Sequence, residues 1–314
     1  MSAGIKSTKV TFSSRGIPIS GILYEPVSES KVASTKAAVV VSHPGGGVKE
    51  QTASFHAKFL AENGFVALVF DAAYQGESGG EPRGIEDPSQ RIEDVKAAVT
   101  YLSILEDKVD PSRIGAVGIC ASGMYVPIAA STDKRIKSVA TVSAADFGSV
   151  IREGIRNADG KPMQTTEQLS SALEGAAASR TKFVKGESYD LFNLFPQREQ
   201  LSDATPLLFK EAYDYYCTPR GSHPRSTGIF QPWSMELLAG FYGATDVLKQ
   251  MAPRPLLYIA GEKADTLYFS KEAYAVASEP KELYIVEGKT HVDLYDSKHH
   301  FPKLLDFFVT TLTR

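Results

Sequence analysis

The sequence predicts an α/β fold, with a mostly parallel central sheet, helices on both faces and an inserted helical cap. The first observation is a set of short apolar runs bounded by turn residues, such as 37–42 and 65–70, which are typical of strands buried on both faces. The second is that helix-like segments alternate with these runs up to residue 142, which predicts right-handed crossovers between parallel strands. The chain of 314 residues, 43% of them hydrophobic, is long enough for one large core. We therefore expect a single domain over residues 1–314.

Local patterns predict the individual elements. Two short strands joined at the turn residues Arg15-Gly16 open the chain, and later strands coincide with apolar runs. Helices are expected where apolar residues recur every three or four positions. The expected strands are 9–13, 18–24, 37–42, 65–70, 114–119, 139–142, 256–260 and 282–286, and the expected helices are 52–63, 90–102, 122–130 and 302–311.

The alternation breaks between residues 147 and 251, which we interpret as a helical cap inserted into the sheet topology. It contains helix-forming runs at 166–179 and 199–216 and a loop rich in Pro, Gly and Ser at 218–232. Its aromatic side chains could line an apolar pocket or pack the cap onto the body, and the sequence leaves both open. They are Tyr189, Phe192, Phe195, Phe209, Tyr213, Tyr215 and Tyr216.

Charge and cysteine content exclude several classes of function. The net charge is −3 and the charges are interspersed, so neither a nucleic-acid groove nor a polybasic membrane patch is expected. Two cysteines form no disulfide framework, and residues 1–11 lack the apolar stretch of a signal peptide. We expect a cytoplasmic protein that acts on a small molecule, without a cofactor, a metal, a nucleic acid or a membrane as partner.

A strand that runs directly into a helix, at Gly118-Ile119-Cys120-Ala121-Ser122, predicts a nucleophile turn. Such a turn needs small residues two before and two after the nucleophile, and Gly118 and Ser122 meet this requirement around Cys120. Ser122 as nucleophile would place the bulky Met124 there, so Cys120 is preferred over it. A buried structural cysteine is the alternative. The start of a helix and a nearby histidine favour the thiolate, so we expect a pKa well below the free value of about 8.5.

The acid and base of such a site follow the nucleophile in the order acid, then histidine. His291 comes after the last strand and before the last helix, so it is the expected base. Asp265, four residues after the strand-ending Gly261, is the preferred acid, and Asp146 is its rival. The other histidines have simpler interpretations: surface positions for His56, His299 and His300, a structural or exposed one for His223, and support of the loop after the first parallel strand for His43.

The oxyanion hole is expected to combine the backbone N–H of Ala121 with one from the loop Gly45-Gly46-Gly47, for which we choose Gly46. Glycine lets the backbone approach a substrate oxygen closely. A phosphate-binding loop would need a Gly-Lys-Ser/Thr ending, which this segment lacks.

Several stretches carry a family resemblance. They are His43-Pro44-Gly45-Gly46-Gly47, residues 70–80, Gly118-Ile119-Cys120-Ala121-Ser122-Gly123, residues 216–221 and residues 291–296. Together they resemble the YcjY-like branch of the α/β-hydrolases, which includes fungal polyketide transferases of the fumagillin-pathway type and relatives of dienelactone hydrolases. The resemblance implies an α/β-hydrolase fold and cleavage or transfer of an acyl group, often a polyketide chain held as a thioester on an acyl carrier protein. It carries Cys120 and His291 over as nucleophile and base, whereas the position of Asp265 varies in that group.

The resulting hypothesis is acyl transfer through an S-acyl intermediate on Cys120, with water or an alcohol as acceptor. Two alternatives stay open: Cys120 and His291 as acid and base of a polyketide cyclase or isomerase, and a non-catalytic ligand-binding protein. The sequence leaves the oligomeric state open, a homodimer included.

Overall fold

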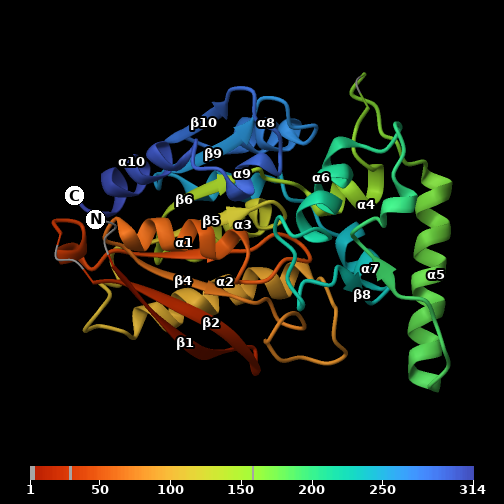
Figure 1. The fold of residues 1–314 in the computed structure, drawn as a ribbon, viewed down its shortest axis with the longest axis horizontal. Coiled ribbons are helices and arrows are strands. Elements are labelled where there is room, and N and C mark those ends of the chain that lie inside the picture. Colours follow the sequence, from red (N-terminus) through yellow and green to blue (C-terminus); the bar gives the residue numbers. More distant parts are fainter. Residues whose placement is uncertain (1–3, 28–29, 158) are drawn as a thin grey trace.

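The computed structural model describes residues 4–27, 30–157 and 159–314 and confirms the predicted α/β fold. Its main sheet has eight strands in the order β1-β2-β4-β3-β5-β6-β9-β10 (Figure 1). The strands are β1 (Ile5–Ser14), β2 (Ile17–Pro26), β3 (Ala38–Ser42), β4 (Val66–Phe70), β5 (Ile114–Ile119), β6 (Ile136–Val142), β9 (Leu256–Gly261) and β10 (Lys281–Val286).

The sheet is parallel except at its N-terminal edge. β1 and β2 form an antiparallel hairpin, and β2 is antiparallel to β4, whereas the pairs from β4 to β10 are parallel. Every residue of β3, β4 and β5 is buried, as expected for continuous apolar runs in the centre of a parallel sheet. The carboxyl ends of β5, β6, β9 and β10 therefore open onto the same edge, where ligands bind in sheets of this kind.

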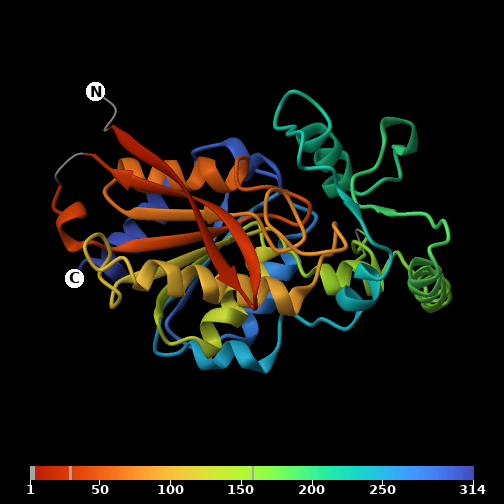
Figure 2. The ribbon, with the colours of Figure 1, turned by 90° about the horizontal axis from the view of Figure 1, so that it is seen from below.

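Helices cover both faces of the sheet, as Figure 2 shows. One face carries α1 and α10, where Phe59 of α1 stacks on Phe301 of α10 at 4.1 Å between ring centroids. α2 and α3 pack together on the other face. The helices of this body are α1 (Thr52–Glu62), α2 (Pro88–Ser103), α3 (Ser122–Thr132), α8 (Leu267–Val276), α9 (Asp293–Asp296) and α10 (Phe301–Leu312).

The segment between β6 and β9 forms a lobe at one end of the molecule (Figure 1). Besides helices it holds a small antiparallel sheet of β7 (Phe192–Asn193) and β8 (Ile229–Phe230), which the sequence did not predict. Its helices are α4 (Phe147–Glu153), α5 (Thr166–Lys185), α6 (Leu207–Tyr216) and α7 (Ser234–Ala239). The helix expected from residue 199 begins only at Leu207, because Pro206 cannot lie inside a helix.

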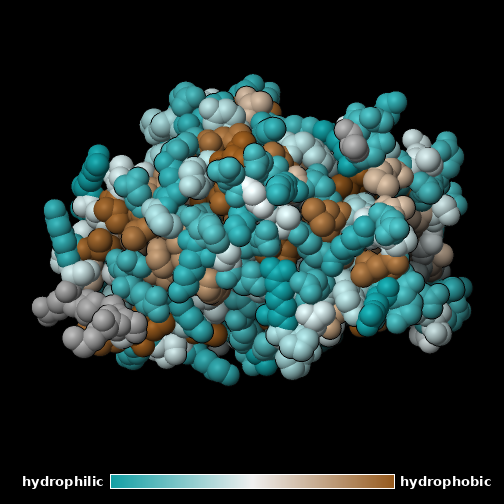
Figure 3. All heavy atoms as spheres, turned by 45° about the horizontal axis from the view of Figure 1, so that its top comes forward, coloured by the Kyte–Doolittle hydropathy of each residue, from teal (hydrophilic) through white to brown (hydrophobic). Residues whose placement is uncertain are grey.

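The surface is mostly hydrophilic on the face drawn in Figure 3, with hydrophobic residues in scattered groups. Among the described residues, no helix is long and apolar enough to cross a membrane. The same residues contain no cluster of three or more His, Cys, Asp or Glu side chains that could hold a metal ion.

Candidate active site

Cys120 occupies the sharp turn between β5 and α3. Its φ of 55° lies in the left-handed region, which is strained for a residue with a side chain. Two backbone hydrogen bonds of 3.0 Å fix it: its N–H donates to Val142, and its carbonyl accepts from Ala145. A Cβ on Gly118 would lie 2.1 Å from the carbonyl oxygen of Ser122, so this position requires glycine. The geometry is that of a nucleophile turn.

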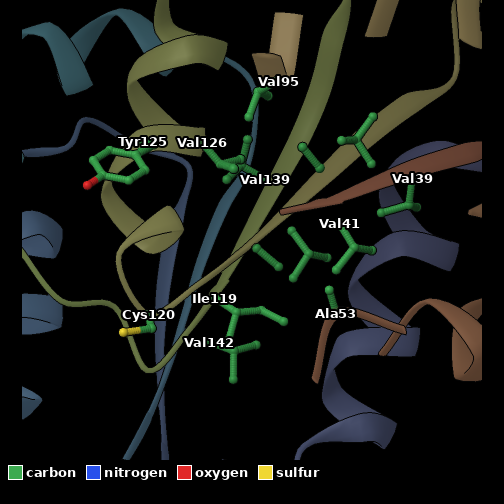
Figure 4. Packing of buried hydrophobic residues seen from close by; sticks show 14 of the residues in the cluster. Val39, Val41, Ala53, Val95, Ile119, Cys120, Tyr125, Val126, Val139 and Val142 are labelled. Carbon is green, nitrogen blue, oxygen red and sulfur yellow. The ribbon is translucent and has the colours of Figure 1, made fainter. Parts of the chain in front are cut away.

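The side chain of Cys120 points away from the apolar core beneath it. Figure 4 shows the sulfur on the side opposite to Ile119 and Val142. Ser122, the alternative nucleophile in the sequence, is buried and its hydroxyl is already hydrogen-bonded. The hydroxyl donates to His43 O at 2.6 Å and accepts from the guanidinium of Arg91 at 2.7 Å. Cys120 is therefore the residue presented by the turn.

Two backbone N–H groups face the sulfur of Cys120, those of Ala121 and Gly45. Ala121 is one of the two predicted donors, whereas the second N–H at the sulfur belongs to Gly45 and not to the predicted Gly46. The loop turns at Gly46, whose φ is +72°, and the Gly46 carbonyl accepts a 2.7 Å hydrogen bond from the hydroxyl of Ser226 in the lobe. Gly45 lines the cavity at Cys120, whereas Gly46 lines a different pocket.

Buried charges hold this loop in place. The ammonium of Lys49 donates to Asp71 Oδ2 at 2.6 Å, and both side chains are fully buried. The amide of Lys49 also donates to Asp71 Oδ1 at 2.8 Å. Since a buried ion pair needs this full hydrogen bonding to offset its desolvation, removing either partner would loosen the loop that carries Gly45.

His291 follows β10 and is completely buried. Ser143, at the end of β6, donates its hydroxyl to the carbonyl of His291 at 2.8 Å. The imidazole makes two contacts: Nδ1 with the hydroxyl of Thr266 at 2.6 Å, and Nε2 with the hydroxyl of Tyr295 at 3.2 Å. Burial lowers the pKa of His291 to about 3, so the ring is neutral at rest.

Neither of the two predicted acids contacts this imidazole among the hydrogen bonds of the described residues. The carboxylate of Asp265 accepts from the amide of Leu208 at 2.9 Å, and burial raises its pKa. Asp146 is the N-cap of α4 and accepts from the amides of Ser149 and Gly243 at 3.1 and 2.8 Å. The contact assigned to Asp265 is instead made by its neighbour Thr266, because the turn before α8 directs the threonine toward His291.

The thiol of Cys120 is also neutral at rest, contrary to the sequence-based expectation. Burial raises its pKa to about 11, and the contacts with the Tyr295 hydroxyl and the two backbone N–H groups only partly oppose that effect. The start of α3 and a neutral imidazole supply too little positive charge to overcome desolvation. In the described residues Cys120 and His291 share no hydrogen bond, and Tyr295 contacts both.

The cavity at Cys120 is apolar and small, with a volume of about 30 Å³. Three of the aromatic residues predicted in the cap line it, namely Phe195, Phe209 and Tyr216, whereas Tyr189 and Phe192 line another pocket beside α5. Its full lining is Gly45, Cys120, Phe147, Leu194, Phe195, Leu208, Phe209, Ala212, Tyr216, Val292 and Tyr295.

A second pocket, of about 430 Å³, is lined by Gly46 and Gly47 of the glycine loop but not by Cys120. Phe195 separates the two spaces, since a Cβ on Gly46 or Gly228 would lie within 2.7 Å of its ring. The phenyl ring also stacks on Tyr216, with centroids 4.1 Å apart. The sulfur of Cys120 belongs to the smaller space, whose volume of about 30 Å³ is too small for an acyl substrate unless the cavity widens.

The remaining histidines depart in part from their predicted surface positions. His56 and His300 are fully buried and pair through their Nε2 atoms at 2.8 Å, whereas His299 is exposed as expected. His43 is buried at the end of β3, where its Nε2 accepts from the amide of Ala72 at 3.0 Å. The sequence-based interpretation missed the buried pair because α1 and α10 meet only in the folded chain.

Thr266 and Tyr295 are the two site residues that sequence reasoning missed. Tyr295 lies four residues after His291, which is one helical turn, so the spacing alone could have suggested a contact. No sequence pattern pointed to Thr266. The residue expected beside the histidine is an aspartate or glutamate, and a threonine does not match it.

The sheet order, the strained turn at Cys120 and the buried histidine after the last strand define a protein of the α/β-hydrolase class. The chain belongs to the dienelactone hydrolase family, whose model matches residues 19–193. It is 38% identical to the uncharacterized protein YcjY of Escherichia coli K12, over 98% of this chain and 99% of that protein.

Two further comparisons support this assignment. The crystal structure of the hypothetical protein PA2218 from Pseudomonas aeruginosa superimposes with a TM-score of 0.88 at 36% identity, covering 98% of this chain and 94% of the other. The polyketide transferase claH of Penicillium crustosum is 27% identical over 94% of this chain and 92% of its own length. The chain is accordingly an enzyme of the hydrolase or acyltransferase type with polyketide-related relatives.

Proposed function

We propose that the protein cleaves or transfers an acyl group, from an ester or a thioester, through an S-acyl intermediate on Cys120. The observation that carries the proposal is the position of the Cys120 sulfur: at the tip of a positive-φ turn, in an apolar cavity, facing the N–H groups of Ala121 and Gly45. A carbonyl carbon bound there would have its oxygen directed at the two donors.

The reaction has two halves. In the first, the sulfur bonds to the acyl carbon, the thiol proton goes to His291, and the leaving thiolate or alkoxide departs with a proton. In the second, water or an alcohol attacks the S-acyl carbon, its proton passes through His291 to the sulfur, and the carbon–sulfur bond breaks to release the acid or ester and restore the thiol. A thioester suits cysteine because the attacking and leaving sulfur atoms are of comparable reactivity.

The substrate is proposed to be an apolar acyl chain of the polyketide type. Support comes from the aromatic and aliphatic lining contributed by residues 147–251, which we regard as the cap of the site, and from the relative named a polyketide transferase. We further propose an acyl carrier protein as donor and a cytoplasmic location, which two free cysteines favour.

A pair of cysteine variants tests the proposal. Hydrolysis of medium-chain acyl thioesters should fall at least about 10³-fold in Cys120→Ala, since the sulfur that forms the proposed intermediate is removed. Cys217→Ala is the matched control, because that cysteine is exposed at the end of α6. Thioester turnover that survives in Cys120→Ala would reject the mechanism.

A second candidate function is acid–base cyclisation or isomerisation of a polyketide. The neutral resting state of Cys120 and His291 favours it, because a neutral thiol can donate a proton and a neutral imidazole can accept one. Product formation without any acylated cysteine would support this candidate over acyl transfer.

A further inference from the structure

Tyr295 lies between the two proposed catalytic groups. It is on α9, one turn after His291, and its hydroxyl lies 3.2 Å from His291 Nε2. The same hydroxyl contacts the sulfur of Cys120, and both residues line the same cavity. Among the described residues it is the group that joins sulfur to imidazole.

The surroundings of Tyr295 hold the phenol in this position. Its side chain is buried, with 2% of its surface exposed. The ring packs edge-on against Tyr215 at 5.2 Å between centroids, and its backbone carbonyl accepts a 2.8 Å hydrogen bond from the hydroxyl of Thr52 in α1. Because both the ring and the backbone of Tyr295 are held, its hydroxyl is suited to transferring a proton along one path.

We propose, on the basis of the acyl-transfer function above, that Tyr295 is a further catalytic residue that relays the proton between Cys120 and His291. As the sulfur attacks the acyl carbon, the S–H proton moves to the phenol oxygen while the phenol proton moves to His291 Nε2. The carbonyl electron pair moves to its oxygen, which is held by Ala121 and Gly45. Tyr295 ends the step as it began, as a neutral phenol.

In the second part of the same half-reaction, the proton moves back from His291 through Tyr295. The oxyanion electron pair re-forms the carbonyl, the bond to the leaving group breaks, and the imidazolium proton returns through Tyr295 to the departing thiolate or alkoxide. This path requires Nδ1–H of His291 to donate to Thr266, so that Nε2 is free to accept.

Burial explains why such a relay suits this cavity. The pKa of the Cys120 thiol is raised and that of His291 is lowered, so a separated thiolate–imidazolium pair is unfavourable at rest. Burial also raises the pKa of Tyr295 well above its ordinary value, which keeps the phenol protonated. A relay lets charge develop only while the carbon–sulfur bond forms.

Single-turnover acylation of Cys120 by an acyl thioester tests the relay. The wild-type protein is measured first: without an adduct on Cys120 the proposed function fails, whatever the role of Tyr295. With an adduct, Tyr295→Phe should acylate about 10²-fold more slowly while KM changes little, since the aromatic ring remains and only the hydroxyl is lost. Tyr258→Phe, which removes a buried hydroxyl on β9, is the matched control and should keep the wild-type rate.

A proton inventory in mixtures of H₂O and D₂O gives a readout that a structural role would not change. The wild-type acylation rate should depend on deuterium content along a curve, because two protons move in the relay. A straight line, which indicates one moving proton, would overturn the relay even if Tyr295→Phe failed to fold. Acylation of Tyr295→Phe at the wild-type rate would overturn it as well, while leaving the S-acyl mechanism intact.

Discussion

Cys120 and His291 are held neutral by the same physical cause. Each side chain loses contact with water on folding, which disfavours its charged form: thiolate for Cys120 and imidazolium for His291. In the proposed acyl transfer, the sulfur therefore becomes nucleophilic only when a substrate enters and the thiol proton can move at the moment of attack. This differs from cysteine enzymes in which an ion pair exists before the substrate binds.

The raised pKa predicts how Cys120 reacts with an alkylating reagent. Labelling by iodoacetamide should accelerate about tenfold per pH unit between pH 7 and 9.5 without reaching a plateau, because the thiolate fraction grows until the pH passes a pKa of about 11. Mass spectrometry of the peptide that contains Cys120 follows the reaction. A plateau near pH 7 would mean that an ion-paired thiolate exists at rest.

The contact of His291 Nδ1 predicts which residue orients the base. Thr266→Val should slow acylation about tenfold, the equivalent of one hydrogen bond of about 1.4 kcal/mol, whereas Thr266→Ser, which keeps the hydroxyl, should recover the rate. Asp265→Asn should stay within about twofold of wild type, because the amide oxygen can still accept from Leu208. A loss in Asp265→Asn larger than in Thr266→Val would restore Asp265 as the orienting acid.

At the scale of elements, the turn between β5 and α3 depends on the absence of a side chain at Gly118. Gly118→Ala would place a methyl group 2.1 Å from the carbonyl oxygen of Ser122, so the free energy of unfolding should fall by about 1–3 kcal/mol. The matched control is Gly175→Ala in α5, where nothing lies within 4 Å of the new Cβ.

That control should be neutral or should stabilise the protein by up to about 1 kcal/mol, because alanine is the better helix former. Urea unfolding of both variants provides the comparison. Equal stability of Gly118→Ala and the wild type would show that the turn adapts, which contradicts a strained nucleophile turn.

Elements differ in how well the sequence predicts them. β3, β4 and β5 are continuous apolar runs, so their composition alone predicts that both of their faces are buried. The nucleophile turn was predictable because its steric limits act on adjacent residues. Pro206 was a local signal for the start of α6 that the predicted helix from residue 199 overlooked. The pair β7 and β8 and the contact of Thr266 with His291 instead depend on segments distant in the chain, for which local patterns carry no signal.

At the scale of the whole molecule, four imidazoles are buried: those of His43, His56, His291 and His300. Burial lowers the pKa of each, that of His56 to about 4. The unfolded chain then binds more protons than the folded one below about pH 6.5. The stabilisation is present above that pH and is lost as the pH falls toward the folded-state values.

This linkage predicts the effect of removing one buried imidazole. His56→Gln should reduce the slope of the unfolding free energy against pH, between pH 6 and 5, by about 1.2 kcal/mol per unit, since one fewer group takes up a proton on unfolding. His299→Gln, at an exposed position, should leave the slope unchanged. Chemical denaturation at a series of pH values measures both, and equal slopes for His56→Gln and wild type would contradict the neutral buried pair.

The proposed acyl transfer depends on a covalent bond between the acyl group and the sulfur of Cys120. The most direct measurement is rapid acid quenching during turnover of an acyl thioester, followed by peptide mass analysis. The account predicts that the peptide carrying Cys120 gains the mass of the acyl group and that the peptide carrying Cys217 does not. Turnover of the thioester with no acylated Cys120 at any quench time would contradict it.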